Sequence, residues 1–249
     1  MQSSVARIPL LGTSTPQDDL KSANIPAGTC TGRTVVSFDV EMPPKRAYQS
    51  AYALKATLTV HLADGNLYHL KLPASFARKL KPDCFELPSA AEEYFRTLFD
   101  LEQASCTREL MAILERRDHS RSEAHDKLKR KGYLDVYVDS SLSWAEERSF
   151  LNDSRFARYF IEEKKRAGWG RRRIELELAS RGVEASLVPG YPDDFFNDED
   201  DLERAESLLA RKRVPDKNAY EKLVRFLVGK GFDYRLSREA VRRRLTALR

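Results

Sequence analysis

The segment RRRIELELASRGV at residues 171–183 decides the predicted fold, because its pattern occurs three times along the chain. Its glycine, Gly182, has counterparts in Gly132 and Gly231, which lie 50 residues before it and 49 residues after it. Apolar residues recur 22, eight and four positions before each glycine, and one and five positions after it. They are Leu110, Phe160 and Leu209; Ala124, Ile174 and Leu223; Leu128, Leu178 and Leu227; Tyr133, Val183 and Phe232; and Tyr137, Leu187 and Leu236. A period of this length indicates a repeated supersecondary unit.

Each unit is predicted to contain three helices, because its apolar residues follow one another at steps of three and four. Each anchor glycine should end the second helix, as a residue with positive φ just past the helix. One such unit cannot bury its apolar face alone. The sequence therefore predicts a mainly α fold with three tandem three-helix repeats in an elongated, curved array, at residues 105–149, 150–199 and 200–249.

The third helix of the second repeat has the weakest helical signal, because Pro189 and Pro192 interrupt the segment 184–194. A proline inside a helix removes a hydrogen bond and clashes with the preceding turn. We expect this helix to be shortened or kinked, and the junction beside it to act as a hinge.

Residues 32–104 predict a small β-hairpin-plus-helix domain that precedes the repeats. Strand signals occur at Thr34–Val40, Ala53–Leu62 and Leu67–Leu72, and the last two flank a predicted three-residue turn. That turn sets a register that pairs Leu62 with Tyr68, Val60 with Leu70 and Leu58 with Leu72 on one face, and His61 with His69 and Thr59 with Lys71 on the other. The histidine pair is a weak metal candidate, since nothing nearby completes a ligand set.

A capping box, Ser89-Ala90-Ala91-Glu92, predicts that a helix follows over about residues 90–104 and packs on the hairpin. Residues 1–31 are rich in Ser, Thr, Pro and Gly and have no period, so we expect a disordered tail.

The composition excludes several classes of protein. No stretch approaches the roughly 18 apolar residues of a membrane helix, and the first residues do not have the pattern of a secretory signal. The three cysteines are far apart and odd in number, so they predict neither a zinc site nor a disulfide framework. A reducing, cytoplasmic location fits this usage.

The positive charge is concentrated in the repeats. Residues 1–104 are neutral, so the whole net charge of +5 belongs to residues 105–249. Eight acidic residues lie between Tyr191 and Glu206, and their only cation is Arg204. A basic body with one acidic segment suggests a polyanionic partner, although a well-solvated helical surface explains the same charges. The acidic segment is interpreted as a linker that also places negative charge at the next helix start. The alternative is that it mimics nucleic-acid phosphates toward a basic site on the partner.

Arg171, Arg172 and Arg173 form the most informative run, because they open the second helix of the second repeat. Cations at a helix N-terminus oppose the helix dipole, so stability does not explain them. Free amides together with arginines would make an anion site. Trp169 either stacks on a base or fills the repeat core.

Similar cation clusters recur in all three repeats, and a solvated face is the alternative for each. The full set of candidate partner or nucleic-acid contacts is Arg116, Arg117, Lys127, Arg130, Lys131, Lys164, Lys165, Arg166, Trp169, Arg171, Arg172, Arg173, Arg211, Lys212, Arg213, Arg242 and Arg243.

No catalytic, cofactor or metal site is predicted. The run Asp118-His119-Ser120 contains the letters of a hydrolytic triad, but adjacent residues cannot converge as triad partners must. Ser120 instead fits a helix N-cap, with Glu123 as its partner three residues on.

Several motifs in residues 105–249 resemble those of the RecX family, regulators of the bacterial RecA recombinase. They are Arg116–Ser120, Phe150–Arg158, Gly168-Trp169-Gly170, Arg173-Ile174, Glu177-Leu178, Arg181-Gly182-Val183, Arg225-Phe226-Leu227, Gly231-Phe232 and Tyr234. The family's three-helix repeats agree with the period above, and its N-terminal extension resembles residues 33–104. The Pro-rich, acidic segment 189–201 and the Ser-rich segment 139–149 depart from the pattern.

The resemblance implies a non-enzymatic, monomeric regulator without cofactors. Its partner would be the RecA–single-stranded DNA filament, whose ATPase and recombination activity it would modulate, with inhibition the favoured direction. The residues alone leave open a second hypothesis, a stand-alone DNA-binding protein with helix-turn-helix-like modules. A third hypothesis is a helical scaffold for other partners.

Overall fold

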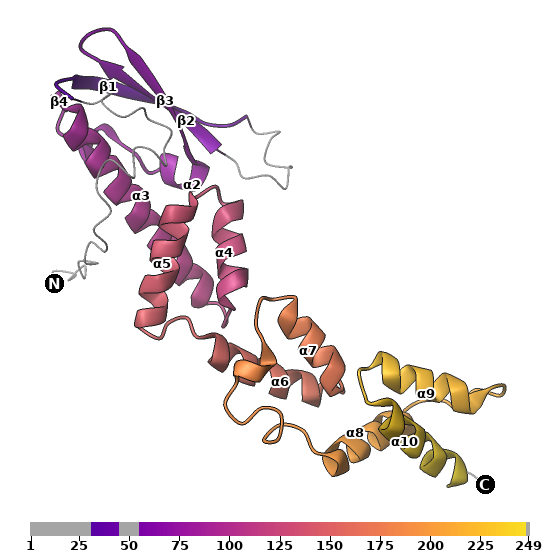
Figure 1. The fold of residues 1–249 in the computed structure, drawn as a ribbon. Coiled ribbons are helices and arrows are strands. Elements are labelled where there is room, and N and C mark those ends of the chain that lie inside the picture. Colours follow the sequence, from indigo (N-terminus) through magenta and orange to yellow (C-terminus); the bar gives the residue numbers. More distant parts are fainter. Residues whose placement is uncertain (1–30, 45–54, 248–249) are drawn as a thin grey trace, which may run out of the picture. The chain divides into compact units, whose positions relative to one another are not determined.

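The structure is a computed structural model that describes residues 31–44 and 55–247 (Figure 1). The predicted disordered tail lies outside these residues, apart from residue 31. The described chain divides into two compact units. One unit holds the sheet and the first repeat up to Leu151, and the other holds His119–Glu123 and everything from Asn152 onward.

The first unit begins with a four-stranded antiparallel sheet of order β3-β2-β1-β4. Its strands are β1 (Thr34–Glu41), β2 (Lys55–Leu62), β3 (Leu67–Pro73) and β4 (Ser89–Ala90). Two short helical segments, α2 (Ala74–Ala77) and η2 (Pro82–Cys84), join β3 to β4. Alternate residues of β2 are buried, so one face of the sheet forms part of a hydrophobic core.

The predicted hairpin is confirmed, but its predicted register is wrong by two residues. Val60 pairs with Tyr68 and Leu58 with Leu70. The loop has three residues, as predicted, but it lies one position earlier, at 63–65, because the amide of Leu62 donates to the carbonyl of Asn66 at 3.0 Å. A shift of two leaves each side chain on its predicted face.

The predicted cross-strand partners on the polar face change with the register. His61 lies opposite Leu67, His69 opposite Thr59, and Lys71 opposite Thr57. The Nε2 atom of His61 lies 2.8 Å from Oδ2 of Asp39. In the described part of the chain, no group of three His, Cys, Asp or Glu residues is arranged to hold a metal ion.

The helix that follows the sheet is α3 (Ala91–Leu114), and two predictions about it are wrong. Its N-cap is Ala90, which makes no side-chain cap bond, because Ser89 and Ala90 pair with β1 as strand β4. The helix also continues ten residues past 104, because its buried face extends through Cys106, Leu110 and Ile113. One core cluster contains residues of the sheet and of α3.

The first repeat consists of the second half of α3, α4 (Arg121–Arg130) and α5 (Asp135–Glu147). Buried hydroxyl groups join its helices: Ser105 Oγ lies 3.0 Å from Tyr133 Oη, and Thr107 Oγ1 lies 3.1 Å from Ser141 Oγ. The predicted boundary between residues 104 and 105 lies inside the continuous helix α3. The domain boundaries remain predictions.

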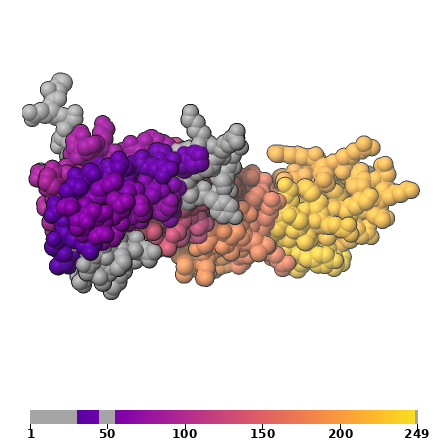
Figure 2. Space-filling view, turned by 90° about the horizontal axis from the view of Figure 1, so that it is seen from above, coloured from indigo at the N-terminus to yellow at the C-terminus, as the bar shows by residue number. Residues whose placement is uncertain are grey.

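The second unit contains the other two repeats. The second repeat has α6 (Asp153–Arg166), α7 (Arg171–Ala179) and the short 3-10 segment η3 (Ala185–Leu187). The third has α8 (Asp198–Ala210), α9 (Ala219–Gly229) and α10 (Tyr234–Thr246), which gather into one body (golden orange to yellow in Figure 2). The mainly α fold with three-helix repeats is thus confirmed, while its elongated, curved form stays a prediction.

The anchor glycines behave as predicted, with φ values of +96° at Gly132, +70° at Gly182 and +93° at Gly231. All the repeat-pattern apolar residues are buried except Leu187, which is 73% exposed. Leu187 ends η3, where the predicted third helix is reduced to one turn. The two prolines beyond it prevent that helix from continuing.

Glu102 is a buried carboxyl group in the first unit, and it gives stability a pH dependence. It is 2% exposed on α3, and burial raises its pKa to about 8 against the opposing effect of Lys55. Because the folded chain holds this proton to higher pH than the unfolded chain, the associated stability is present at low pH. It should be lost between about pH 5 and pH 8, at about 1.4 kcal/mol per pH unit.

A Glu102→Gln variant is expected to remove this dependence. Chemical unfolding at pH 5 and pH 8 should show the variant more stable than the wild type at pH 8 and closer to it at pH 5. The matched control is Glu93→Gln, because Glu93 lies on the same helix and is exposed. Equal pH profiles for the wild type and Glu102→Gln would contradict the assignment.

Candidate functional site

The N-terminus of α7, where the arginine run lies, packs against the turn that ends α9. The Gly170 amide donates to the Lys230 carbonyl at 2.8 Å, and the Arg172 amide donates to the Gly231 carbonyl at 3.1 Å. A Cβ atom at Gly170 would lie 2.3 Å from the backbone of Gly231. The hypothesis of free amides at this terminus is therefore wrong for Gly170 and Arg172, whose amides are taken by the next repeat's backbone.

The side chains of the run all have partners, which explains why cations are tolerated here. Arg171 Nε lies 2.8 Å from a carboxylate oxygen of Glu175, whose other contact is the hydroxyl of Tyr191 at 2.5 Å. Hydrogen bonding to Glu175 and Tyr191 raises the pKa of Arg171. Arg172 bonds to Asp233 at 3.0 Å. Arg171 and Arg172 nevertheless remain 45% and 64% exposed, so an external anion can still reach them.

The same type of contact, between a helix start and a glycine turn, occurs one repeat earlier, at the start of α4. Ser120 caps α4 by accepting the Glu123 amide at 3.1 Å, as predicted, and donates to the carbonyl of Arg181 at 2.7 Å. Arg181 also pairs with Glu123, and Gly182 packs against Ser122. In both contacts the second helix of one repeat begins against the glycine turn of the following repeat. His119 is buried beside Glu123 at 3.1 Å, so His119 and Ser120 both make contacts within the fold.

Trp169 lies at the margin of the second repeat's core and is only partly buried. The guanidinium of Arg173 lies 3.9 Å from the centre of the Trp169 ring, and the ammonium of Lys164 lies 5.5 Å from it. The ring thus packs on the core, as one of the two alternatives predicted, while stacking on a base stays a prediction.

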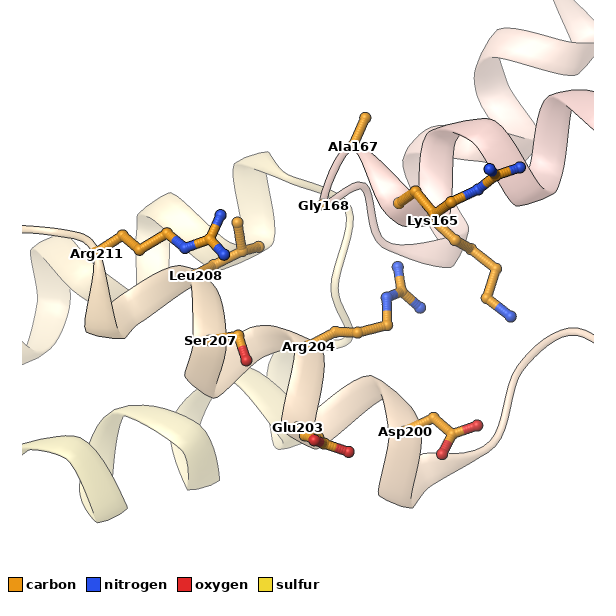
Figure 3. A pocket seen from close by; sticks show the side chains of 10 residues that line it. Lys165, Ala167, Gly168, Asp200, Glu203, Arg204, Ser207, Leu208 and Arg211 are labelled. Atoms are coloured by element: carbon orange, nitrogen blue, oxygen red, sulfur yellow. The ribbon is translucent and has the colours of Figure 1, made fainter.

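An open cleft of about 660 Å³ lies between the end of α6 and α8, within the second unit (Figure 3). Its lining brings together the predicted residues Lys165, Arg166 and Arg211. Figure 3 shows Arg204 extending from α8 toward the end of α6. Asp200 and Glu203 also line the cleft, so the lining has four cations and two carboxylates.

Two of those four cations form hydrogen bonds within the fold. Lys165 bonds to the carbonyl of Phe195 and is 18% exposed. Arg204 bonds to Asp201 and to the carbonyl of Trp169, and burial lowers its pKa. Arg166 and Arg211 are exposed and remain available to a ligand.

The remaining candidates are distributed over all three repeats. In the first repeat Lys131 pairs with Glu109 at 2.8 Å, Arg130 bonds to the carbonyl of Asp126, and Arg116 and Arg117 are exposed. In the third repeat Lys212 lies over the Phe226 ring at 4.1 Å, Arg243 pairs with Glu239 at 2.9 Å, and Arg213 and Arg242 are exposed. The prediction that these clusters form one continuous binding surface stays a prediction.

The acidic segment is partly helical, because α8 begins at Asp198 behind the N-cap Asn197. Four acidic residues lie in its first turn, where the helix dipole favours them, as predicted. Sequence reasoning missed the role of Arg204. Its position as the only cation among eight acids was the available signal.

The second repeat of this chain matches a known protein family. Residues 152–188 match the family model described as "RecX, second three-helix domain". The chain is 33% identical over 145 residues to the "Regulatory protein RecX" of Vibrio vulnificus, which covers 55% of this chain and 91% of that protein. A protein of the same name from Caldanaerobacter subterraneus is 27% identical over 148 residues, or 59% of this chain and 74% of the relative.

A crystal structure described as regulatory protein RecX is similar in fold. It aligns with 82% of this chain and 96% of its own, with a TM-score of 0.51 and 18% sequence identity. Among the described helices, none is long and apolar enough to cross a membrane.

Proposed function

This chain belongs to the RecX family of regulatory proteins, and from that premise we propose that it regulates the RecA recombinase. It binds the RecA–single-stranded DNA filament as a cytoplasmic monomer and modulates, chiefly by inhibition, the filament's ATPase and recombination activity. It does so without a cofactor or a catalytic site of its own. The observation that carries the proposal is the match that spans 91% of a regulatory RecX protein.

The charge of the chain supports a filament partner. Each repeat has exposed arginines, among them Arg116, Arg172 and Arg242. Weak contacts on linked repeats add through their effective concentration, so three modest sites can give firm binding. Contacts to phosphate release counterions, so affinity should fall with salt by a slope of roughly 0.7 per phosphate on single strands.

Co-sedimentation with preformed filaments tests this proposal. The chain should sediment with RecA filaments assembled on single-stranded DNA, and filament length in electron micrographs should change as the chain is added. Added salt should weaken the association. A chain that stays in the supernatant at all salt concentrations, with filament length unchanged, would contradict the proposal.

The alternative is a stand-alone DNA-binding protein whose three-helix units act as helix-turn-helix modules. It would shift bare duplex DNA tightly in a gel without any recombinase. A shift of that kind, together with no effect on filaments, would favour the alternative.

Neutralising the arginine run is expected to weaken filament binding. The double variant Arg171→Gln, Arg172→Gln should raise the apparent Kd by about tenfold, or ~1.4 kcal/mol, because two exposed cations are lost. Lys222→Gln is the matched control, since Lys222 is an exposed cation on α9 outside the candidate set. Titration of labelled filaments measures both variants, and equal affinities would remove the arginine run from the contact surface.

A further inference from the structure

A group of two tyrosines and two arginines lies on α9 and α10 of the third repeat, and we call it the tyrosine–arginine cluster. Its members are Tyr220, Tyr234, Arg238 and Arg242. The Nε atom of Arg238 donates to the hydroxyl of Tyr220 at 3.1 Å, and its guanidinium lies 5.6 Å from the centre of the Tyr234 ring. Arg238 is therefore held in place by contacts with both tyrosines.

The Tyr234 ring is available to a ligand, because 55% of this residue is exposed. Tyr234, Arg238 and Arg242 are spaced four residues apart on α10, so they share one face of the helix. Together they extend over about 12 Å of the helix.

The charge of this face is only partly balanced. Two other arginines of α10 have carboxylate partners: Arg235 pairs with Asp198, and Arg243 pairs with Glu239 and Glu206. The neighbouring Asp233 accepts Arg172. Within the described part of the chain, no carboxylate pairs with Arg238 or Arg242. A partner at this face therefore needs negative charge.

We propose that the tyrosine–arginine cluster binds single-stranded nucleic acid, with a base stacked on Tyr234 and the backbone phosphates beside Arg238 and Arg242. Every base offers a face for stacking, and an arginine held against an aromatic ring strengthens such a platform. The bound nucleic acid must be single-stranded, because the faces of paired bases are stacked within the duplex. The inference rests on the proposed function, since it gives this chain its own contact with the strand that the filament encloses.

The chain offers a matched control in Tyr159. This tyrosine is 61% exposed on α6, and among the described residues no cation lies over its ring. If exposure of a tyrosine were enough for stacking, Tyr159 and Tyr234 would contribute equally. If the arginine held against the ring matters, only Tyr234 contributes.

The experiment uses the full chain and a labelled 20-nucleotide oligothymidine, without recombinase, and follows fluorescence anisotropy. Tyr234→Ala should raise the Kd by about tenfold, within the range for loss of one stacked base. Tyr234→Phe and Tyr159→Ala should bind as the wild type does. Arg242→Gln should lower the slope of log affinity against log salt by roughly 0.7. Thermal melts check that each variant is folded.

Several results would overturn the inference. They are absence of binding to the oligonucleotide, equal loss in Tyr234→Ala and Tyr159→Ala, and equal affinity for a duplex of the same length. Equal, Tyr234-dependent binding of labelled polyglutamate would show an acidic-peptide site instead. Regulation of RecA filaments by a chain that fails to bind the bare strand would reject this inference while leaving the proposed function intact.

Discussion

A Gly170→Ala variant is expected to lose about 3 kcal/mol of stability in the second unit. The added Cβ would lie 2.3 Å from the carbonyl carbon of Gly231 and from the amide nitrogen of Phe232. Both are backbone atoms of the next repeat, so no side-chain rotation relieves the clash. Overpacking of this kind costs typically 1–3 kcal/mol, and here it also breaks the bonds from the start of α7 to Lys230 and Gly231.

Urea unfolding followed by circular dichroism measures the loss, and hydrogen exchange locates it in α7, α9 and the turn between α9 and α10. The control is Gly229→Ala, since a Cβ at Gly229 would meet no atom within 4 Å. Alanine at this helical position should leave stability unchanged or raise it by up to about 1 kcal/mol. If the two variants unfolded at the same urea concentration, the close glycine joint would not be needed for stability.

The second large effect is expected at Leu178, a repeat-pattern residue with no exposed surface. Leu178→Ala should lower the free energy of unfolding by about 2–5 kcal/mol, because it leaves a cavity between α6 and α7. Leu187 belongs to the same apolar pattern but is 73% exposed. Leu187→Ala should therefore change stability by no more than about 0.5 kcal/mol.

The two leucine variants are compared by denaturant midpoint and by the exchange of α6 and α7 amides. A large loss for Leu187→Ala would mean that the third helix of the second repeat packs more fully than its single turn suggests. A small loss for Leu178→Ala would contradict the buried core that the repeat pattern describes.

The repeats were predictable from the sequence, because their signals are local and occur three times. Gly132, Gly182 and Gly231 each require positive φ, and the leucine four residues earlier is always on the buried side of the same helix. The interruption at Pro189 was predictable for the same reason, since a proline acts on its own backbone and on the preceding turn.

Features that depend on distant partners were predicted less well. The hairpin register depends on how Asp64 and Asn66 close the loop, and a three-residue loop at 63–65 fits the same apolar alternation as one at 64–66. Ser89 has the chemistry of an N-cap, but pairing with β1 takes its place in the structure. The end of α3 depends on packing with α5, which local sequence does not reveal.

The candidate site was predictable as a set of cations and not as a set of contacts. The position of Arg171 at a helix start followed from the repeat pattern, whereas its contact with Glu175 and the nearby Tyr191 did not. The approach of Gly170 to Gly231 joins residues about 60 positions apart, so no periodicity in the chain reveals it. The tyrosine–arginine cluster likewise depends on how α9 packs against α10.

ATP turnover by preformed RecA filaments, followed as this chain is added, tests the central claim most directly. The chain is proposed to restrain the filament by contact, so turnover should fall in a saturable way as the chain is added, and the salt that weakens binding should restore it. ATP turnover that stays constant at saturating amounts of the folded chain would contradict the account.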